Sequence, residues 1–266
     1  DDDQPVPGDL DDLPTGLSAD LFYRLLLRIG GSRAALAGAA LLATDTSFLL
    51  TARCDWGPVA LQHVFLIGGM LLLLRFAQTG ERRWAAAGSF LFGLACWDKA
   101  LFLWLLSGLC AAALLVFPRK VLALAGPRVL ALALLCFVLG ALPLVIYNLD
   151  SSGPFLPTLR GNASPDFTAL GPKALFVLST LDGSALFGYL VPFDSDSARR
   201  PETPWERACV RLSDLSGHPR RSLLGLAFLA SLALWPLVRR KPAGRAALFA
   251  LVALLGLWLK KRATRG

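Results

Sequence analysis

Charged residues are scarce in this chain of 266 residues: Asp, Glu, Lys and Arg make up 17% of it, whereas 55% of the residues are hydrophobic. The mean hydropathy is +0.56. A water-soluble domain of this length needs a larger polar surface to cover its core. The composition therefore argues against a soluble protein and favours a membrane protein with several spans.

Metal-binding and redox residues are also few. The chain has two histidines, His63 and His218, and none of its five cysteines forms a CxxC pair. Three of the cysteines lie inside apolar runs, where a thiol behaves as a small hydrophobic group. We therefore expect neither a disulfide framework nor a metal site of His and Cys ligands. A site in which oxygen atoms of the outer loops hold a divalent ion remains an open alternative.

The first twenty residues lack the basic segment and apolar stretch of a signal peptide. They are acidic and rich in proline instead. A polytopic membrane protein is expected to begin with a membrane anchor. We therefore interpret residues 1–20 as an acidic tail, the end of a missing outer loop, and the chain as a fragment.

Basic residues occur in short clusters between the apolar runs, as in "RRW" at 82, "PRK" at 118 and "RRK" at 239. The net charge of +8 is thus not gathered on one face, as nucleic-acid binding requires. We expect no nucleic-acid partner. The spacing is typical of cytoplasmic loops under the positive-inside rule.

Apolar runs of helical length predict an all-α, polytopic bundle of transmembrane helices with one larger non-cytoplasmic loop region. The core is expected over residues 21–148, the loop with an interfacial helix at 173–191 over 149–221, and a truncated C-terminal hairpin over 222–266. Within these parts the predicted spans are 34–52, 58–76, 84–97, 100–117, 128–147, 222–238 and 246–259.

Two of the predicted outer turns contain an acid, a base and a tryptophan. The first holds Arg53, Asp55 and Trp56, and the second, "CWDKALF", holds Asp98 and Lys99. These residues could serve only as interfacial anchors, a surface ion pair and a snorkelling lysine. The alternative is that Arg53 and Lys99 together bind the phosphate of a lipid at the outer surface.

Three further polar residues lie near the same rim. Asp45, in "ATDTSF", is predicted two to three turns inside its helix, where Thr44 and Thr46 offer hydroxyl groups. Gln62 and His63 follow at the top of the next helix. We consider a functional hydrogen-bond network and purely structural packing for these residues, and for His63 packing is the simpler alternative.

The segments "ALLATDTSFLLTARCDWGPVALQHVFLIGGMLLLLRF", "FLFGLACWDKALFLW" and "PLVIYNLDSSGPF" carry a resemblance to a known group. They resemble the GT-C superfamily of membrane glycosyltransferases, specifically bacterial relatives of protein O-mannosyltransferases and of the aminoarabinose transferases that modify lipid A. The resemblance covers residues 20 to 150 well and the rest loosely. In that family an outer turn reads like "TKG", where this chain has Asp98, Lys99 and Ala100.

The resemblance implies an all-helical enzyme of the bacterial inner membrane with its site on the periplasmic side. It implies inverting transfer of a sugar from a polyprenyl-phosphate donor to an acceptor of unknown class, in contact with membrane lipid and without a certain cofactor. Arg53 and Lys99 would bind the donor phosphate, and Asp55 and Asp98 would orient them or contact the sugar. The family's catalytic base lies in a first outer loop that has no counterpart here.

Two other functions remain open at the level of sequence. A transporter is expected to place ionisable residues at the bilayer midplane on broken helices, often within inverted repeats. Here the charges collect at the rims of the predicted spans, and no repeat is visible. A noncatalytic membrane subunit or a remnant of an enzyme is favoured by the missing first loop.

Overall fold

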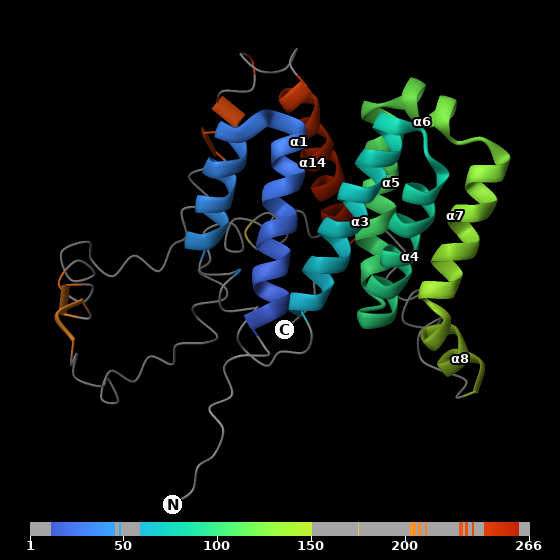
Figure 1. The fold of residues 1–266 in the computed structure, drawn as a ribbon, viewed down its shortest axis with the longest axis horizontal. Coiled ribbons are helices and arrows are strands. Elements are labelled where there is room, and N and C mark those ends of the chain that lie inside the picture. Colours follow the sequence, from blue (N-terminus) through green and yellow to red (C-terminus); the bar gives the residue numbers. More distant parts are fainter. Residues whose placement is uncertain are drawn as a thin grey trace, which may run out of the picture.

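The computed structural model describes residues 12–45, 48, 59–150 and 242–260, with single positions between 175 and 236. All regular structure in these residues is helical, and Figure 1 shows the longer helices lying side by side. The helices are α1 (Asp12–Thr44), α3 (Val59–Thr79), α4 (Arg82–Asp98), α5 (Phe102–Val116), α6 (Pro118–Leu124), α7 (Pro127–Gly140), α8 (Leu142–Asp150) and α14 (Pro242–Lys260).

Helix α1 folds back on itself at Gly31, as the bend in its ribbon shows (Figure 1). Gly31 has φ 79° and ψ −178°, a combination that only glycine adopts readily. As a result Gly38 on the second half lies against Leu26 and Phe22 on the first half. The sequence did not predict this hairpin, and α1 also includes residues 12–20, which we had assigned to the acidic tail.

The centre of the bundle is the tight packing of α3, α4 and α7. A Cβ atom on Gly93 of α4 would collide with the backbone carbonyl oxygen of Phe137, and one on Gly140 of α7 would collide with that of Phe90. Phe92, Phe102 and Cys96 form the buried cluster beside this contact. Small residues thus allow close helix approach, as is common between membrane helices.

Proline marks the beginning of several helices. Pro118, Pro127 and Pro242 are the first residues of α6, α7 and α14, where their missing N–H leaves no intrahelical hydrogen bond unmade. Pro143 is the second residue of α8 and coincides with a 64° bend after α7. The predicted span 128–147 is therefore two helices, with a turn at Ala141.

Helix α14 packs against α5 although more than a hundred residues separate them in sequence. The guanidinium of Arg245 donates a hydrogen bond from Nη2 to the carbonyl oxygen of Val116 over 3.0 Å. It also lies 4.8 Å from the centre of the Phe117 ring, which in turn contacts Phe249. The beginning of α14 is thereby fixed to the end of α5.

The turns place most charged side chains at the two ends of the bundle. The end that holds the α3–α4 turn and α6 (Figure 1), which we call the basic end, carries Arg28, Arg75, Arg82, Arg83, Arg119, Lys120, Arg128 and Arg245. Arg28 is placed there by a 3.1 Å hydrogen bond to Gln78. The opposite end, which we call the polar end, carries Asp45, His63, Asp98 and Lys99. Asp20 and Arg24, paired over 2.8 Å part-way along α1, are an exception.

By length and composition, two described helices could cross a membrane: Pro14–Thr44, which folds back at Gly31, and Ala60–Thr79. The bent pairs α5 with α6 and α7 with α8 raise the number to four if each pair is one span. Helix α4 has 17 residues and is not among them. Leucines on α7 such as Leu134 and Leu135 are exposed, as lipid-facing side chains are expected to be. The predicted helices 222–238 and 173–191 fall almost wholly outside the described residues.

Candidate functional site

The candidate site lies at the polar end, where α3 begins and α4 ends. The tight turn at Gly80, with φ 73°, joins these helices as an antiparallel hairpin. The first turn of α3 therefore lies beside the last turn of α4. This arrangement brings His63 into the neighbourhood of Asp98 and Lys99, although 35 positions separate His63 from Asp98 in the sequence.

Lys99 is held at the point where α4 ends and the chain turns into α5. Its backbone leaves the helical conformation, with φ −141° and ψ 110°, while its N–H still donates to the carbonyl oxygen of Ala95 over 3.0 Å. Its own carbonyl oxygen accepts from the N–H of Phe102 over 2.8 Å. The backbone of Lys99 is thus fixed by hydrogen bonds, the residue is half-buried, and its positive charge acts electrostatically on both His63 and Asp98.

Asp98 is the last residue of α4 and is half-buried. Burial raises the pKa of its carboxyl group, because the charged form loses hydration, and the positive charge of Lys99 opposes this shift without cancelling it. Its Oδ2 atom is buried without a hydrogen-bond partner in the described part of the chain. Asp98 therefore retains an acceptor that can serve a ligand or Lys99.

Asp45 and His63 are connected through Phe48. The backbone N–H of Phe48 donates to Oδ2 of Asp45 over 2.9 Å, and the Phe48 ring lies 5.4 Å from the imidazole of His63 at an interplanar angle of 41°. Asp45 is buried, with 6% of its surface exposed. A cap of this kind is a frequent role for Asp three positions before a helical N–H.

The position of Asp45 differs from the one we predicted. α1 ends at Thr44, so Asp45 lies just after a helix and not two to three turns inside one. The hydroxyl of Thr44 bonds to the carbonyl oxygens of Ala40 and Leu41 and is not directed to Asp45. The stretch Thr44-Asp45-Thr46-Ser47 favours this break, since Asp, Thr and Ser compete for backbone hydrogen bonds.

Five described side chains have a buried polar atom that lacks a hydrogen-bond partner among the described residues. They are Oγ1 of Thr15, Oδ1 of Asp45, Nδ1 of His63, Oδ2 of Asp98 and Oδ1 of Asn148. Such atoms are uncommon in native proteins, because leaving one unpaired costs about 1–3 kcal/mol. Three of the five belong to the predicted site residues Asp45, His63 and Asp98, so these side chains have unused hydrogen-bonding capacity.

The remaining predicted residues divide into two groups. Gln62 is half-buried in α3 next to His63. Arg53 and Asp55 lie outside the described residues, in the segment between Phe48 and Val59. Sequence reasoning missed Phe48. Its backbone hydrogen bond to Asp45 could have been predicted from the spacing Asp-x-x-Phe in a stretch rich in capping residues. No pattern in the nearby sequence predicted the contact between the Phe48 and His63 rings.

Few side chains in the described part of the site could ligate a metal ion. Among the residues that the structure describes, no group of three or more His, Cys, Asp or Glu side chains lies close enough to hold an ion. The chemistry available in this part of the site is therefore that of one ammonium group, one imidazole and two carboxyl groups.

Comparison with known proteins gives no relative: no family model, no curated protein and no solved structure matches the chain.

Proposed function

We propose that the chain is an integral membrane glycosyltransferase of the GT-C type, which transfers a sugar from a polyprenyl-phosphate donor to an acceptor on the outer side of the membrane. The proposal rests on the sequence resemblance around residues 20 to 150 and on the all-helical bundle with candidate membrane spans. The observation that carries it is the ammonium group of Lys99, which lies beside Asp98 and His63 at one end of that bundle.

In this proposal the acceptor oxygen attacks the anomeric carbon of the sugar, and the bond between that carbon and the phosphate oxygen breaks. The lipid phosphate leaves with the electron pair, and its new negative charge is stabilised by Lys99 together with Arg53. The acceptor gives its proton to a general base, which we do not assign to a described residue. Asp98 orients Lys99, and Asp55 orients Arg53 or contacts the sugar.

Lys99 has the properties that a phosphate ligand needs. Backbone hydrogen bonds hold the main chain of Lys99 in place at the end of α4. It lies at the end of α4, at the level where a lipid headgroup meets the helices. Asp98 next to it supplies an unpaired oxygen that can orient the ammonium group or accept from a sugar hydroxyl.

The test is transfer of a labelled sugar from a polyprenyl-phosphate donor by membranes that contain the protein. We expect Lys99→Ala to lower turnover by roughly 100-fold, as loss of one charge-stabilising group typically does. Arg53→Ala should have a similar effect. Lys120→Ala is the matched control, because Lys120 is an exposed lysine on α6 at the opposite end of the bundle.

Lys99→Arg distinguishes a lost charge from a damaged fold. It keeps the positive charge, so it should retain more turnover than Lys99→Ala at equal protein abundance. Turnover that is unchanged in both Lys99→Ala and Arg53→Ala would overturn the assignment of the phosphate site. Absence of transfer by the unaltered protein with every donor would favour a noncatalytic subunit.

A further inference from the structure

The basic end of the bundle carries much more positive charge than its own carboxylates compensate. Between described residues the structure shows two ion pairs, Asp20 with Arg24 and Glu81 with Arg83, and only the second is at this end. Arg28 bonds to the neutral side chain of Gln78. Arg82, Arg119, Lys120 and Arg128 are exposed. This end therefore attracts anions.

Two guanidinium groups converge on one indole at the α3–α4 turn. The guanidinium carbon of Arg75 lies 4.9 Å from the centre of the Trp84 ring, and that of Arg83 lies 4.8 Å from it. Each contact with the ring is worth about 0.5–1 kcal/mol at an exposed site, but the two cations repel each other. An anion bound to either guanidinium would lower that repulsion. We call Arg75, Arg83 and Trp84 the Trp84 clamp.

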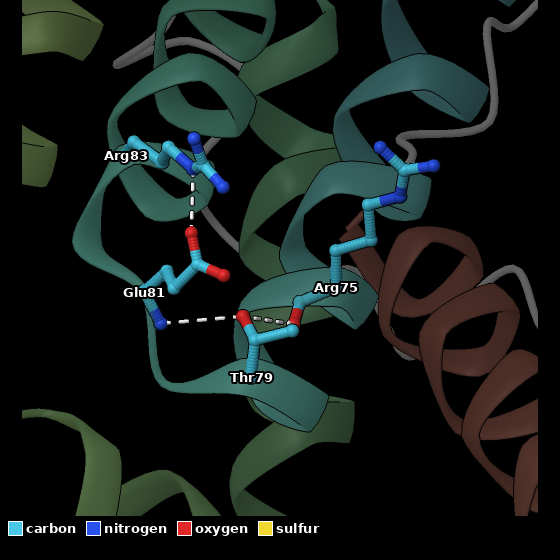
Figure 2. Close-up of polar contacts among 4 residues, drawn as sticks. All are labelled: Arg75, Thr79, Glu81 and Arg83. Carbon is cyan, nitrogen blue, oxygen red and sulfur yellow. Dashed lines mark hydrogen bonds and ion pairs between the residues drawn. The ribbon is translucent and has the colours of Figure 1, made fainter.

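Hydrogen bonds hold the backbone of the α3–α4 turn beside the clamp. Figure 2 shows the side chains of Arg75 and Arg83 extending from neighbouring helices on either side of it. The hydroxyl of Thr79 donates to the carbonyl oxygen of Arg75 over 3.0 Å and accepts from the N–H of Glu81 over 3.2 Å. Glu81 pairs with Nε of Arg83, which leaves the terminal nitrogens of that guanidinium available.

The surroundings of the clamp are those of a membrane surface. Helix α6 is bent by 107° from α5, so it crosses the basic end roughly at right angles to the bundle helices. It carries Arg119 and Lys120, and Leu122 on it is 72% exposed, a mixture typical of a helix in the interface. Tryptophan is enriched at the same level, where the indole meets headgroups.

We propose that the Trp84 clamp binds the phosphate of an anionic phospholipid headgroup. Arg75 and Arg83 supply charge-assisted hydrogen bonds to the phosphate oxygens, and the apolar helices beside them contact the acyl chains. Arg28 and Arg82 add to the attractive potential. A lipid is favoured over a free phosphate or an acidic peptide because the clamp lies at the end of lipid-length apolar helices, and the interfacial helix α6 lies at the same end of the bundle. The proposal does not depend on sugar transfer.

The experiment measures the thermal midpoint of the purified chain in neutral detergent as phosphatidylglycerol or phosphatidylcholine is added. A lipid that binds the folded state raises the midpoint. We expect phosphatidylglycerol to raise it and phosphatidylcholine to have little effect. Arg75→Gln and Arg83→Gln should each weaken the phosphatidylglycerol response by several-fold. Arg24→Gln is the matched control, because Arg24 is likewise paired with a carboxylate but lies part-way along α1, away from the clamp.

Three outcomes would overturn the proposal: a full response in Arg75→Gln and Arg83→Gln, an equal response to phosphatidylcholine, or the same response to inorganic phosphate alone. Should the glutamine variants fail to fold, Arg75→Lys and Arg83→Lys keep the charge but lose the planar fork. We then expect a weaker phosphatidylglycerol response with a normal midpoint in the absence of lipid, and an unchanged response would count against the clamp.

Discussion

Burial and a neighbouring charge act in opposite directions on Asp98, and burial is the larger effect. Its carboxyl group has a raised pKa although Lys99 follows it directly in the chain. Such a group is easily shifted by a ligand: an anionic phosphate bound to Lys99 would remove the opposing effect and raise the pKa further. The protonation of Asp98 and phosphate binding by Lys99 are therefore coupled in the proposed site.

The raised pKa of Asp98 predicts the sign of a pH effect on stability. The folded chain binds this proton more tightly than the unfolded chain, so the contribution of Asp98 is most favourable below its ordinary pKa of 3.8. It is lost as the pH rises through the raised value. Relative to Asp98→Asn, the unaltered protein should thus lose stability as the pH rises from 4 toward neutral.

Thermal unfolding in detergent across this pH range checks the prediction. Asp20→Asn is the control, because Asp20 is a carboxylate part-way along α1, away from Lys99 and the polar end. Parallel pH profiles for the unaltered protein and Asp98→Asn would contradict the shift.

At the scale of the helices, the fold-back of α1 depends on a single residue. Alanine at position 31 would have to adopt φ 79° with ψ −178°, which costs about 1–3 kcal/mol for a residue with a Cβ atom. We expect Gly31→Ala to lower the free energy of unfolding by that amount. Gly16→Ala, in the first half of α1 and with no atom near the added Cβ, should be neutral or slightly stabilising.

Unfolding in mixed micelles measures both variants. Equal stability of Gly31→Ala and the unaltered protein would mean that the hairpin does not require this conformation. A destabilised Gly16→Ala would show instead that α1 tolerates no change at all.

The sequence predicted helices where apolar runs end at charges or prolines. The spans expected at 58–76, 84–97 and 100–117 are confirmed as helices α3, α4 and α5. The hairpin in α1 and the break after Gly140 were missed, because the first depends on a positive φ and the second on a turn within an unbroken apolar run. Neither changes the hydrophobic pattern from which spans are predicted.

The candidate site was also predictable only in part, because the hydrophobic pattern predicts helices but not how they bend and pair. Asp98 and Lys99 stand out in sequence, because charges are rare in so apolar a chain. Their proximity to His63 follows from the antiparallel α3–α4 hairpin, and the contact of His63 with Phe48 follows from the end of α1 at Thr44. Such contacts depend on how helices pair, and spacing along the chain does not encode them.

At the scale of the whole molecule, the arrangement of charge predicts an orientation in the membrane. The basic end holds eight described lysines and arginines, whereas the polar end holds Lys99, and Lys260 lies at the far end of α14. Under the positive-inside rule the basic end faces the cytoplasm, so the proposed sugar-transfer site faces outward and the Trp84 clamp meets the inner leaflet. The two proposed sites then lie at opposite faces of the same bilayer.

Reporter fusions in a bacterial host test this orientation. Alkaline phosphatase is active only outside the cytoplasm, whereas green fluorescent protein exported in the unfolded state does not fluoresce. We expect fluorescence from a fusion after Glu81, at the basic end, and phosphatase activity from a fusion after Ala100, at the polar end. A fusion after Ala125 should fluoresce again, because α5 returns the chain to the basic end before α6.

The reversed pattern at all three positions would place the Lys99 site in the cytoplasm. A donor displayed on the outer face could then not reach it, and the proposed glycosyl transfer would have to be abandoned. The Trp84 clamp would survive that result, because it requires an anionic leaflet at the basic end and not a particular side. The fusions therefore distinguish the two proposals, because only the proposed sugar transfer depends on which side of the membrane each end faces.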